Sequence, residues 1–272
     1  MERKVVIHTW TQNVSNQPKS SFWGLGDILR GTCTLYNLSK KYDFDLIVDY
    51  SLHPISKFLE ADNHPYKDFI EKYKKYIMFI NPEQLESFIF NNLKSYKIIL
   101  LHTNGPHTTF LSQLSDDCKI FVKSLLKPNK SFEEYINNNL VSIPYRSYNI
   151  LHFRLGDRSI LYNNPVNLEK KYYEYDNILD KYVEENDIII SDTLNFKLVT
   201  SKVRDIFTFN TTPAHMGFTS DEESVRDTLF EFILASKANK IKTYSTYTWT
   251  SGFMTAVNLI YDIPIDVMMN DT

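Results

Sequence analysis

The amino-acid sequence predicts an α/β fold with mainly parallel sheets. Short segments typical of strands alternate with helical segments along the whole chain, which is the pattern of repeated strand–helix units. The chain has 272 residues, enough for one large domain or two small ones, and 43% of them are hydrophobic while 23% are charged. These proportions are typical of a globular protein and argue against disorder.

The expected elements follow this alternation in both halves of the chain. Strands are expected at 4–8, 45–50, 76–80, 97–102, 148–153, 187–191, 205–209, 240–244 and 265–268. Helices are expected at 26–41, 82–93, 116–126, 168–185, 194–203, 221–237 and 250–260. Ser220 and Glu223 have the spacing of a capping box at the start of one helix. Residues 127–146, with two prolines and a run of asparagines, predict the connection between a domain at 1–145 and a second at 146–272.

Charge and cysteine content exclude several classes of protein. The net charge of −3 gives no broad attraction to nucleic acid or to an anionic membrane, and no segment is long and apolar enough to span a bilayer. Cys33 and Cys118 fit neither a metal knuckle nor a disulfide framework. We therefore expect a soluble protein of a reducing, cytoplasmic compartment.

Four segments after predicted strands carry residues suited to chemistry, and ligands of open α/β sheets bind at that edge. The first is Gly24-Leu25-Gly26-Asp27, followed by Arg30. Two glycines allow a tight turn and close approach of the backbone to a phosphate, although a simple helix cap would use the same residues.

The second segment runs from His152 to Asp157. Residues 152 and 154 of an extended chain point the same way, so His152 and Arg154 would face one site, with Gly156 turning the chain behind them. An arginine fork is well suited to clamp a diphosphate. The alternative is a structural pair between Arg154 and Asp157.

The third and fourth segments follow the next strands. Asp192 could accept a hydrogen bond from a ribose hydroxyl or a base N–H, or could cap the next helix. Hydroxyls and free N–H groups before the last helix predict an anion site, unless they only cap that helix; the side chains concerned are Ser245, Thr246, Tyr247 and Thr248.

Taken together and in order, these segments resemble the GDP-fucose-dependent fucosyltransferases, nearest to the alpha-1,2 type. The family pattern His-x-Arg-x-Gly-Asp is similar to residues 152–157, and a strand ending in Ser-Asp is similar to 191–192. An acidic helix followed by Ser-(Ser/Thr)-Phe-Ser-Trp is similar to Glu231 followed by 245–249, and Gly-x-Gly-Asp/Asn to 24–27. The resemblance is dense from about 148 to 260.

This resemblance implies a GT-B fold, in which two Rossmann-like domains face each other across a cleft, with the donor on the C-terminal domain and the acceptor on the N-terminal one. It implies inverting, metal-independent transfer of fucose from GDP-fucose to a glycan, without a cofactor. By resemblance, Arg154 binds the β-phosphate, His152 the nucleotide, Thr246 and Thr248 phosphates, and Glu231 guanine.

Other site residues are expected beside these. Asp227 lies one helical turn before Glu231. Leu155 occupies the place of the family's second basic residue, which Arg30 or Arg158 would then supply. Asp27 and Asp157 are the candidate catalytic bases.

Two alternatives remain open. A metal-dependent nucleotide-sugar transferase would use Asp43-Phe44-Asp45 as its metal-binding motif, although these residues begin a predicted strand rather than follow one. A non-catalytic protein of the same fold would bind a nucleotide or a glycan without turnover.

Overall fold

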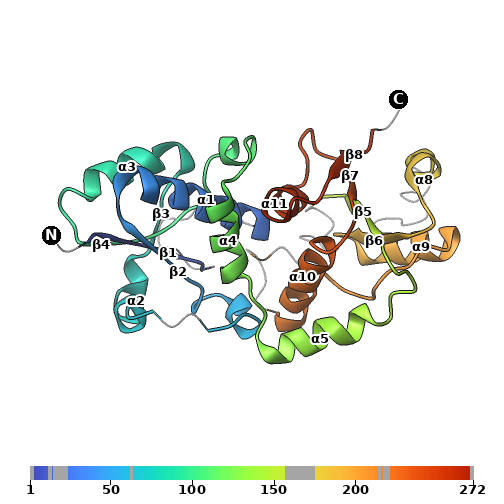
Figure 1. The fold of residues 1–272 in the computed structure, drawn as a ribbon, viewed down its shortest axis with the longest axis horizontal. Helices are drawn as coiled ribbons and strands as arrows, with labels where there is room; N and C mark the ends of the chain where they lie inside the picture. Colours follow the sequence, from blue (N-terminus) through green and yellow to red (C-terminus); the bar gives the residue numbers. More distant parts are fainter. Residues whose placement is uncertain are drawn as a thin grey trace. The chain divides into compact units, whose positions relative to one another are not determined.

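The computed structural model describes residues 3–11, 14, 24–61, 64–156, 175–213, 216 and 221–269. The chain divides into two compact units, Met1–Glu133 and Glu134–Thr272, and each is built on a four-stranded parallel sheet (Figure 1). The α/β prediction with parallel sheets is therefore confirmed. The division falls within helix α5 (Lys130–Leu140), before the limit at 145–146 predicted from the sequence.

In the first unit the strand order is β2-β1-β4-β3. Its strands and α-helices are β1 (Val5–Thr9), α1 (Leu25–Tyr42), β2 (Asp45–Asp49), α2 (Lys67–Tyr73), β3 (Met78–Phe79), α3 (Leu85–Asn92), β4 (Ile98–His102) and α4 (Asp116–Leu125). Short 3-10 helices lie between them at η1 (Pro54–Lys57), η2 (Lys74–Tyr76), η3 (Pro82–Gln84) and η4 (His107–Phe110).

Helices cover both faces of this first sheet. On one face α1 and α3 bury Leu35 and Ile89 against Val6 and the other inward side chains of β1 and β4. On the opposite face α2 buries Ile70 against Val5 and its neighbours. The alternation of side chains along β1 thus supplies both cores, which is the reason its five residues are apolar or uncharged and buried.

In the second unit the strand order is β6-β5-β7-β8. Its elements are β5 (Asn149–Arg154), α8 (Asp176–Tyr182), β6 (Asp187–Ser191), α9 (Leu194–Arg204), α10 (Glu222–Ala235), β7 (Ile241–Ser245), α11 (Gly252–Tyr261) and β8 (Ile265–Val267). On one face α8 and α9 pack on Leu151 and Phe153 of β5. On the other side α10 and α11 pack against each other through Phe232 and Phe253 (Figure 1).

One predicted strand was wrong. Segment 205–209 is no strand: it makes one parallel bridge, Ile188 with Phe207. The Thr208 hydroxyl donates to the Ile189 carbonyl, so a side-chain hydrogen bond stands where a strand would have a backbone one. The stretch 127–146, expected to connect the two halves, contains a helix that was not expected, α5.

The predicted capping box at Ser220 was also wrong. The residue that caps α10 is Asp221, whose carboxylate accepts from the Ser224 N–H at 2.9 Å. Ser220 itself, and residues 168–174 of one predicted helix, lie outside the described residues.

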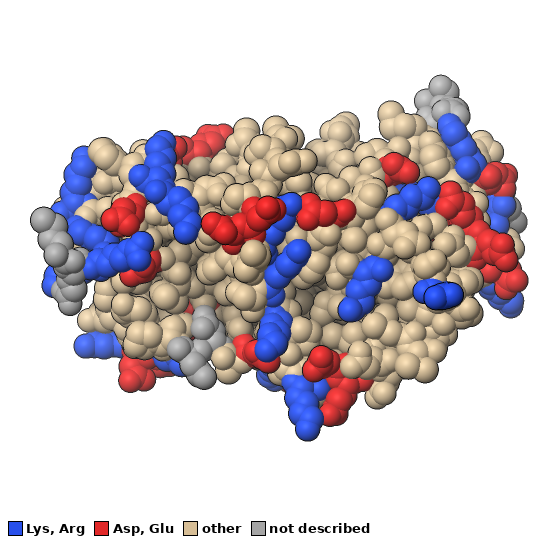
Figure 2. Space-filling view, viewed as in Figure 1, with Lys and Arg blue, Asp and Glu red and all other residues tan. Residues whose placement is uncertain are grey.

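Charged side chains of both signs are mixed over the face shown in Figure 2, in keeping with 30 basic and 33 acidic residues in the chain. Among the described helices, none is long and apolar enough to cross a membrane.

Candidate functional site

The carboxyl ends of β5 and β7 form the topological switch point of the second sheet. From β5 the chain moves to β6 on one side, and it later returns to β7 on the other side of β5. Loops that leave such a pair of strands diverge and open a crevice, where ligands of doubly wound sheets bind. The residues at these two strand ends are Arg154 and Ser245, which are register partners.

The backbone of Arg154 belongs to β5 and is also hydrogen-bonded to the segment that follows β7. It is the last residue of β5, its carbonyl accepts from the Thr246 N–H at 3.0 Å, and its side chain is half-buried. Its guanidinium carbon lies 5.7 Å from the centre of the Tyr247 ring. The expected neighbourhood of Arg154 and the 245–248 segment is thus present, and an arginine held over an aromatic ring can offer its planar fork to an oxyanion.

His152 points to the same side of β5 as Arg154 but is deeper in the protein. It is buried, and its Nδ1 lies 2.8 Å from the Thr243 hydroxyl on β7. Burial, and next the positive charge of Arg154, lower the pKa of His152 to about 3. The imidazole is therefore neutral at physiological pH and contributes hydrogen bonds, not charge, to this site.

Asp192 ties the end of β6 to the loop after β5. Its two carboxylate oxygens accept from the N–H groups of Leu155 at 2.8 Å and of Gly156 at 3.0 Å. The alternative that Asp192 caps α9 is wrong, because Thr193 holds that position. Gly156 has a φ of +122°, which only glycine adopts readily, so the turn predicted behind Arg154 requires this residue.

The segment after β7 leads into α11, and the space beside the first residues of this helix is open. The Tyr247 N–H donates to the Ser245 hydroxyl at 3.2 Å, and α11 begins five residues later. Ser251, which caps α11 in backbone position, has a buried hydroxyl that finds no hydrogen-bond partner among the described residues. A Cβ added to Gly252 would meet nothing within 4 Å. A buried hydroxyl, an open space and the positive end of a helix together suit an anion.

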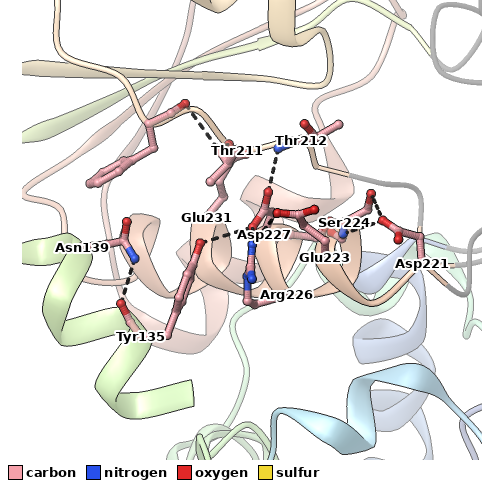
Figure 3. A network of polar contacts seen from close by, with 12 residues as sticks. Tyr135, Asn139, Thr211, Thr212, Asp221, Glu223, Ser224, Arg226, Asp227 and Glu231 are labelled. Carbon is pink, nitrogen blue, oxygen red and sulfur yellow. Dashed lines mark hydrogen bonds and ion pairs between the residues drawn. The ribbon is translucent and has the colours of Figure 1, made fainter. Parts of the chain in front are cut away.

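The two candidates on α10, Asp227 and Glu231, already bond to protein groups (Figure 3). Asp227 accepts from the Thr212 N–H at 2.9 Å, from Arg226 at 3.0 Å and from the Tyr135 hydroxyl of α5 at 3.3 Å. The guanidinium of Arg226 also lies over the Tyr135 ring. These contacts join α5 to α10, and the substrate contact expected for Asp227 stays a prediction.

Glu231 forms a buried ion pair that the sequence did not reveal. Its Oε1 accepts from Lys197 Nζ at 2.7 Å and from the Thr211 hydroxyl at 2.6 Å, and the Lys197 side chain is wholly buried. A lysine in an amphipathic helix predicts a solvent-facing charge, so no sequence signal marked Lys197. The guanine contact of Glu231 stays a prediction beside this structural role.

In the first unit, the Gly24 segment is a helix cap. Gly24 has an ordinary extended backbone and donates to Asp27 Oδ2 at 3.2 Å, while Gly26 lies buried in the first turn of α1. Arg30 is buried and bonds to Asp27 Oδ1 at 2.8 Å and to the Asn104 carbonyl at 3.1 Å. Both oxygens of Asp27 therefore already accept a hydrogen bond, which fixes the carboxylate at the start of α1.

The remaining sequence candidates are placed as follows. Asp43 and Asp45 flank the guanidinium of Arg3 at 3.2 and 2.8 Å, at the amino end of β2 and opposite the edge where parallel sheets bind ligands. This arrangement gives the metal-dependent alternative no support. Asp157 and Arg158 lie outside the described residues.

Several solved structures have the same fold as this chain. NodZ, an alpha-1,6-fucosyltransferase soaked with GDP-fucose, matches with a TM-score of 0.58 at 13% identity over 97% of this chain and 94% of that chain. The fucosyltransferase NodZ from Bradyrhizobium matches with a TM-score of 0.59 at 12% identity, over 97% of this chain and 95% of that chain. The chain has a fucosyltransferase fold. POFUT1 in complex with GDP shares this fold, with a TM-score of 0.51 at 8% identity, over 98% of this chain and 99% of that chain.

The Arabidopsis thaliana FUT1 mutant R284K in complex with GDP also has the fucosyltransferase fold, with a TM-score of 0.55 at 10% identity over 98% of this chain and 70% of that chain. No protein-family model matches the chain, and no curated protein matches its sequence. The predicted GT-B-like class is confirmed by these matches, whereas the alpha-1,2 type stays a prediction.

Proposed function

We propose that the chain is a glycosyltransferase that moves fucose from GDP-fucose to a hydroxyl of a glycan acceptor. The observation that carries this proposal is the position of Arg154 at the switch point of a fold whose solved examples include proteins with GDP or GDP-fucose. The open start of α11, with the buried Ser251 hydroxyl, supports a diphosphate at the same strand end.

In this proposal the acceptor oxygen attacks the anomeric carbon of fucose on the face opposite the diphosphate. The bond from that carbon to the phosphate oxygen breaks, GDP leaves, and the configuration inverts. The hydroxyl proton passes to a base, for which Asp27 and Asp157 are the candidates. We further propose an alpha-1,2 linkage; methylation analysis of the product tests the linked position, and the coupling constant of the fucose anomeric proton tests the alpha configuration.

Negative charge grows on the diphosphate as it leaves. A fixed guanidinium beside it stabilises the transition state more than the ground state, because the charge there is larger. Arg154 supplies this cation, and Thr246 and Thr248, both exposed at the end of β7, supply hydroxyls to the phosphates. His152, being neutral, acts as a hydrogen-bonding partner of the nucleotide.

GDP and GDP-fucose are expected to raise the melting temperature, whereas ADP- and UDP-sugars raise it far less. A ligand that binds only the folded state stabilises it by about 2.7 kcal/mol at a concentration of 100 times its Kd. The measurement is a thermal-shift panel, with guanosine as the control that lacks the diphosphate. Equal shifts with UDP-sugars would contradict the guanine specificity, and binding without transfer would favour the non-catalytic alternative.

Transfer is expected to survive EDTA, because the proposal places Arg154 and the start of α11 where a metal would otherwise neutralise the diphosphate. The measurement is fucose transfer before and after dialysis against EDTA, with Mn²⁺ added back. Loss of transfer that Mn²⁺ restores would replace this mechanism by a metal-dependent one.

A further inference from the structure

Trp249 is an exposed indole that the donor site does not use. It lies two residues after Tyr247, and 63% of its surface is exposed. Tryptophan is highly buried on average, and this one is open at the ligand-binding edge of the sheet. The exposed hydroxyls of Thr246 and Thr248 lie in the same short segment.

The indole is held in a fixed orientation. It stacks on the Tyr247 ring with the centroids 4.9 Å apart and the planes 17° apart. Tyr247 is itself positioned by its contacts, because its N–H donates to the Ser245 hydroxyl and the Arg154 guanidinium lies over its ring. One face of the indole is thus covered by tyrosine, and the exposed surface that remains presents a flat apolar plane.

The plane lies next to the candidate phosphate contact. Tyr247 is the neighbour of both groups: its ring centre is 5.7 Å from the Arg154 guanidinium carbon and 4.9 Å from the indole centroid. A group that stacks on Trp249 would therefore lie at the same strand end as a diphosphate on Arg154. An acceptor sugar has to reach this strand end, because transfer requires it beside the donor.

We propose that Trp249, supported by Tyr247, is a stacking platform for a pyranose ring of the acceptor glycan. This inference rests on the proposed function and names the substrate class of the same site. A pyranose has an apolar face of C–H groups, which packs on an aromatic plane such as the open face of this indole.

The test separates the acceptor from the donor. Trp249→Ala is expected to raise the KM for the acceptor about tenfold or more, while the KM for GDP-fucose and the Kd of GDP stay within twofold. Trp249→Phe keeps an aromatic plane and is expected to restore most of the acceptor affinity. Met269→Ala, a residue of similar exposure in the same unit, is the control and should change neither constant.

A binding measurement keeps the inference independent of transfer. Lactose, N-acetyllactosamine and chitobiose are titrated into the protein, and tryptophan fluorescence and calorimetry are recorded. At least one is expected to give a saturable fluorescence change that Trp249→Phe abolishes while calorimetric binding persists. The platform would be overturned if none of the three disaccharides bound. It would also be overturned if Trp249→Ala left the acceptor KM unchanged or weakened only the binding of GDP. Failure of the proposed function alone would show as no GDP shift and no transfer, with the disaccharide result intact.

Discussion

The Arg154→Lys variant is expected to fold normally and to transfer fucose about 10²-fold more slowly than the parent protein, on the scale of losing one preorganised donor to developing charge. Lysine keeps the charge but loses the planar two-pronged fork that matches a phosphate. The loss should appear in kcat as well as in KM, because the contact strengthens as the diphosphate leaves. Arg154→Ala should be slower still.

Folding should be almost unaffected, because the bond that joins Arg154 to β7 uses its backbone carbonyl and not its side chain. The measurement is steady-state transfer from GDP-fucose with a melting curve for each variant. Arg146→Lys, an exposed arginine of the same unit, is the matched control. A folded Arg154→Lys enzyme with near-normal kcat would remove Arg154 from the site, and a lower melting temperature with normal kcat would make it a structural residue.

Lys197→Met is expected to destabilise the protein by about 3–5 kcal/mol, since it leaves the Glu231 carboxylate buried without its cation. This is a large share of the stability of a typical domain. The double variant Lys197→Met/Glu231→Leu removes both charges and should recover most of the loss. The measurement is the free energy of unfolding from urea titration.

Lys202→Met is the matched control, because Lys202 is an exposed lysine of the same helix, α9, and should change stability by no more than about 0.5 kcal/mol. Glu231→Gln separates the two roles of the glutamate. A structural role predicts a loss of stability, whereas a variant of normal stability that no longer distinguishes GDP from other nucleotides would make Glu231 the guanine contact.

The strands and the neighbourhood of Arg154 could be predicted because local patterns encode them. An apolar segment that ends in His152-Phe153-Arg154 and a glycine is a strand followed by a turn, and the structure has both. The contact of Arg154 with the segment after β7 follows from parallel pairing, which brings the carboxyl ends of strands to one edge.

Other features depend on tertiary contacts that no local pattern contains. Asparagines at 137–139 weaken helix propensity, yet α5 forms because Tyr135 bonds to Asp227 and packs on Phe230. The ion pair of Glu231 could not be predicted for the same reason: its partner Lys197 lies 34 positions earlier in the chain. We interpreted the segment 24–27 from its two glycines, whereas its geometry depends on the ion pair between Asp27 and Arg30.

The pair of Lys197 and Glu231 also limits how the sequence can diverge. A substitution at either position alone leaves one charge stranded in the interior, so lineages that lose only one of them pass through a poorly folded intermediate. Relatives of this chain should therefore carry both residues or neither, and positions 197 and 231 should covary across an alignment even where the surrounding helix surfaces have drifted.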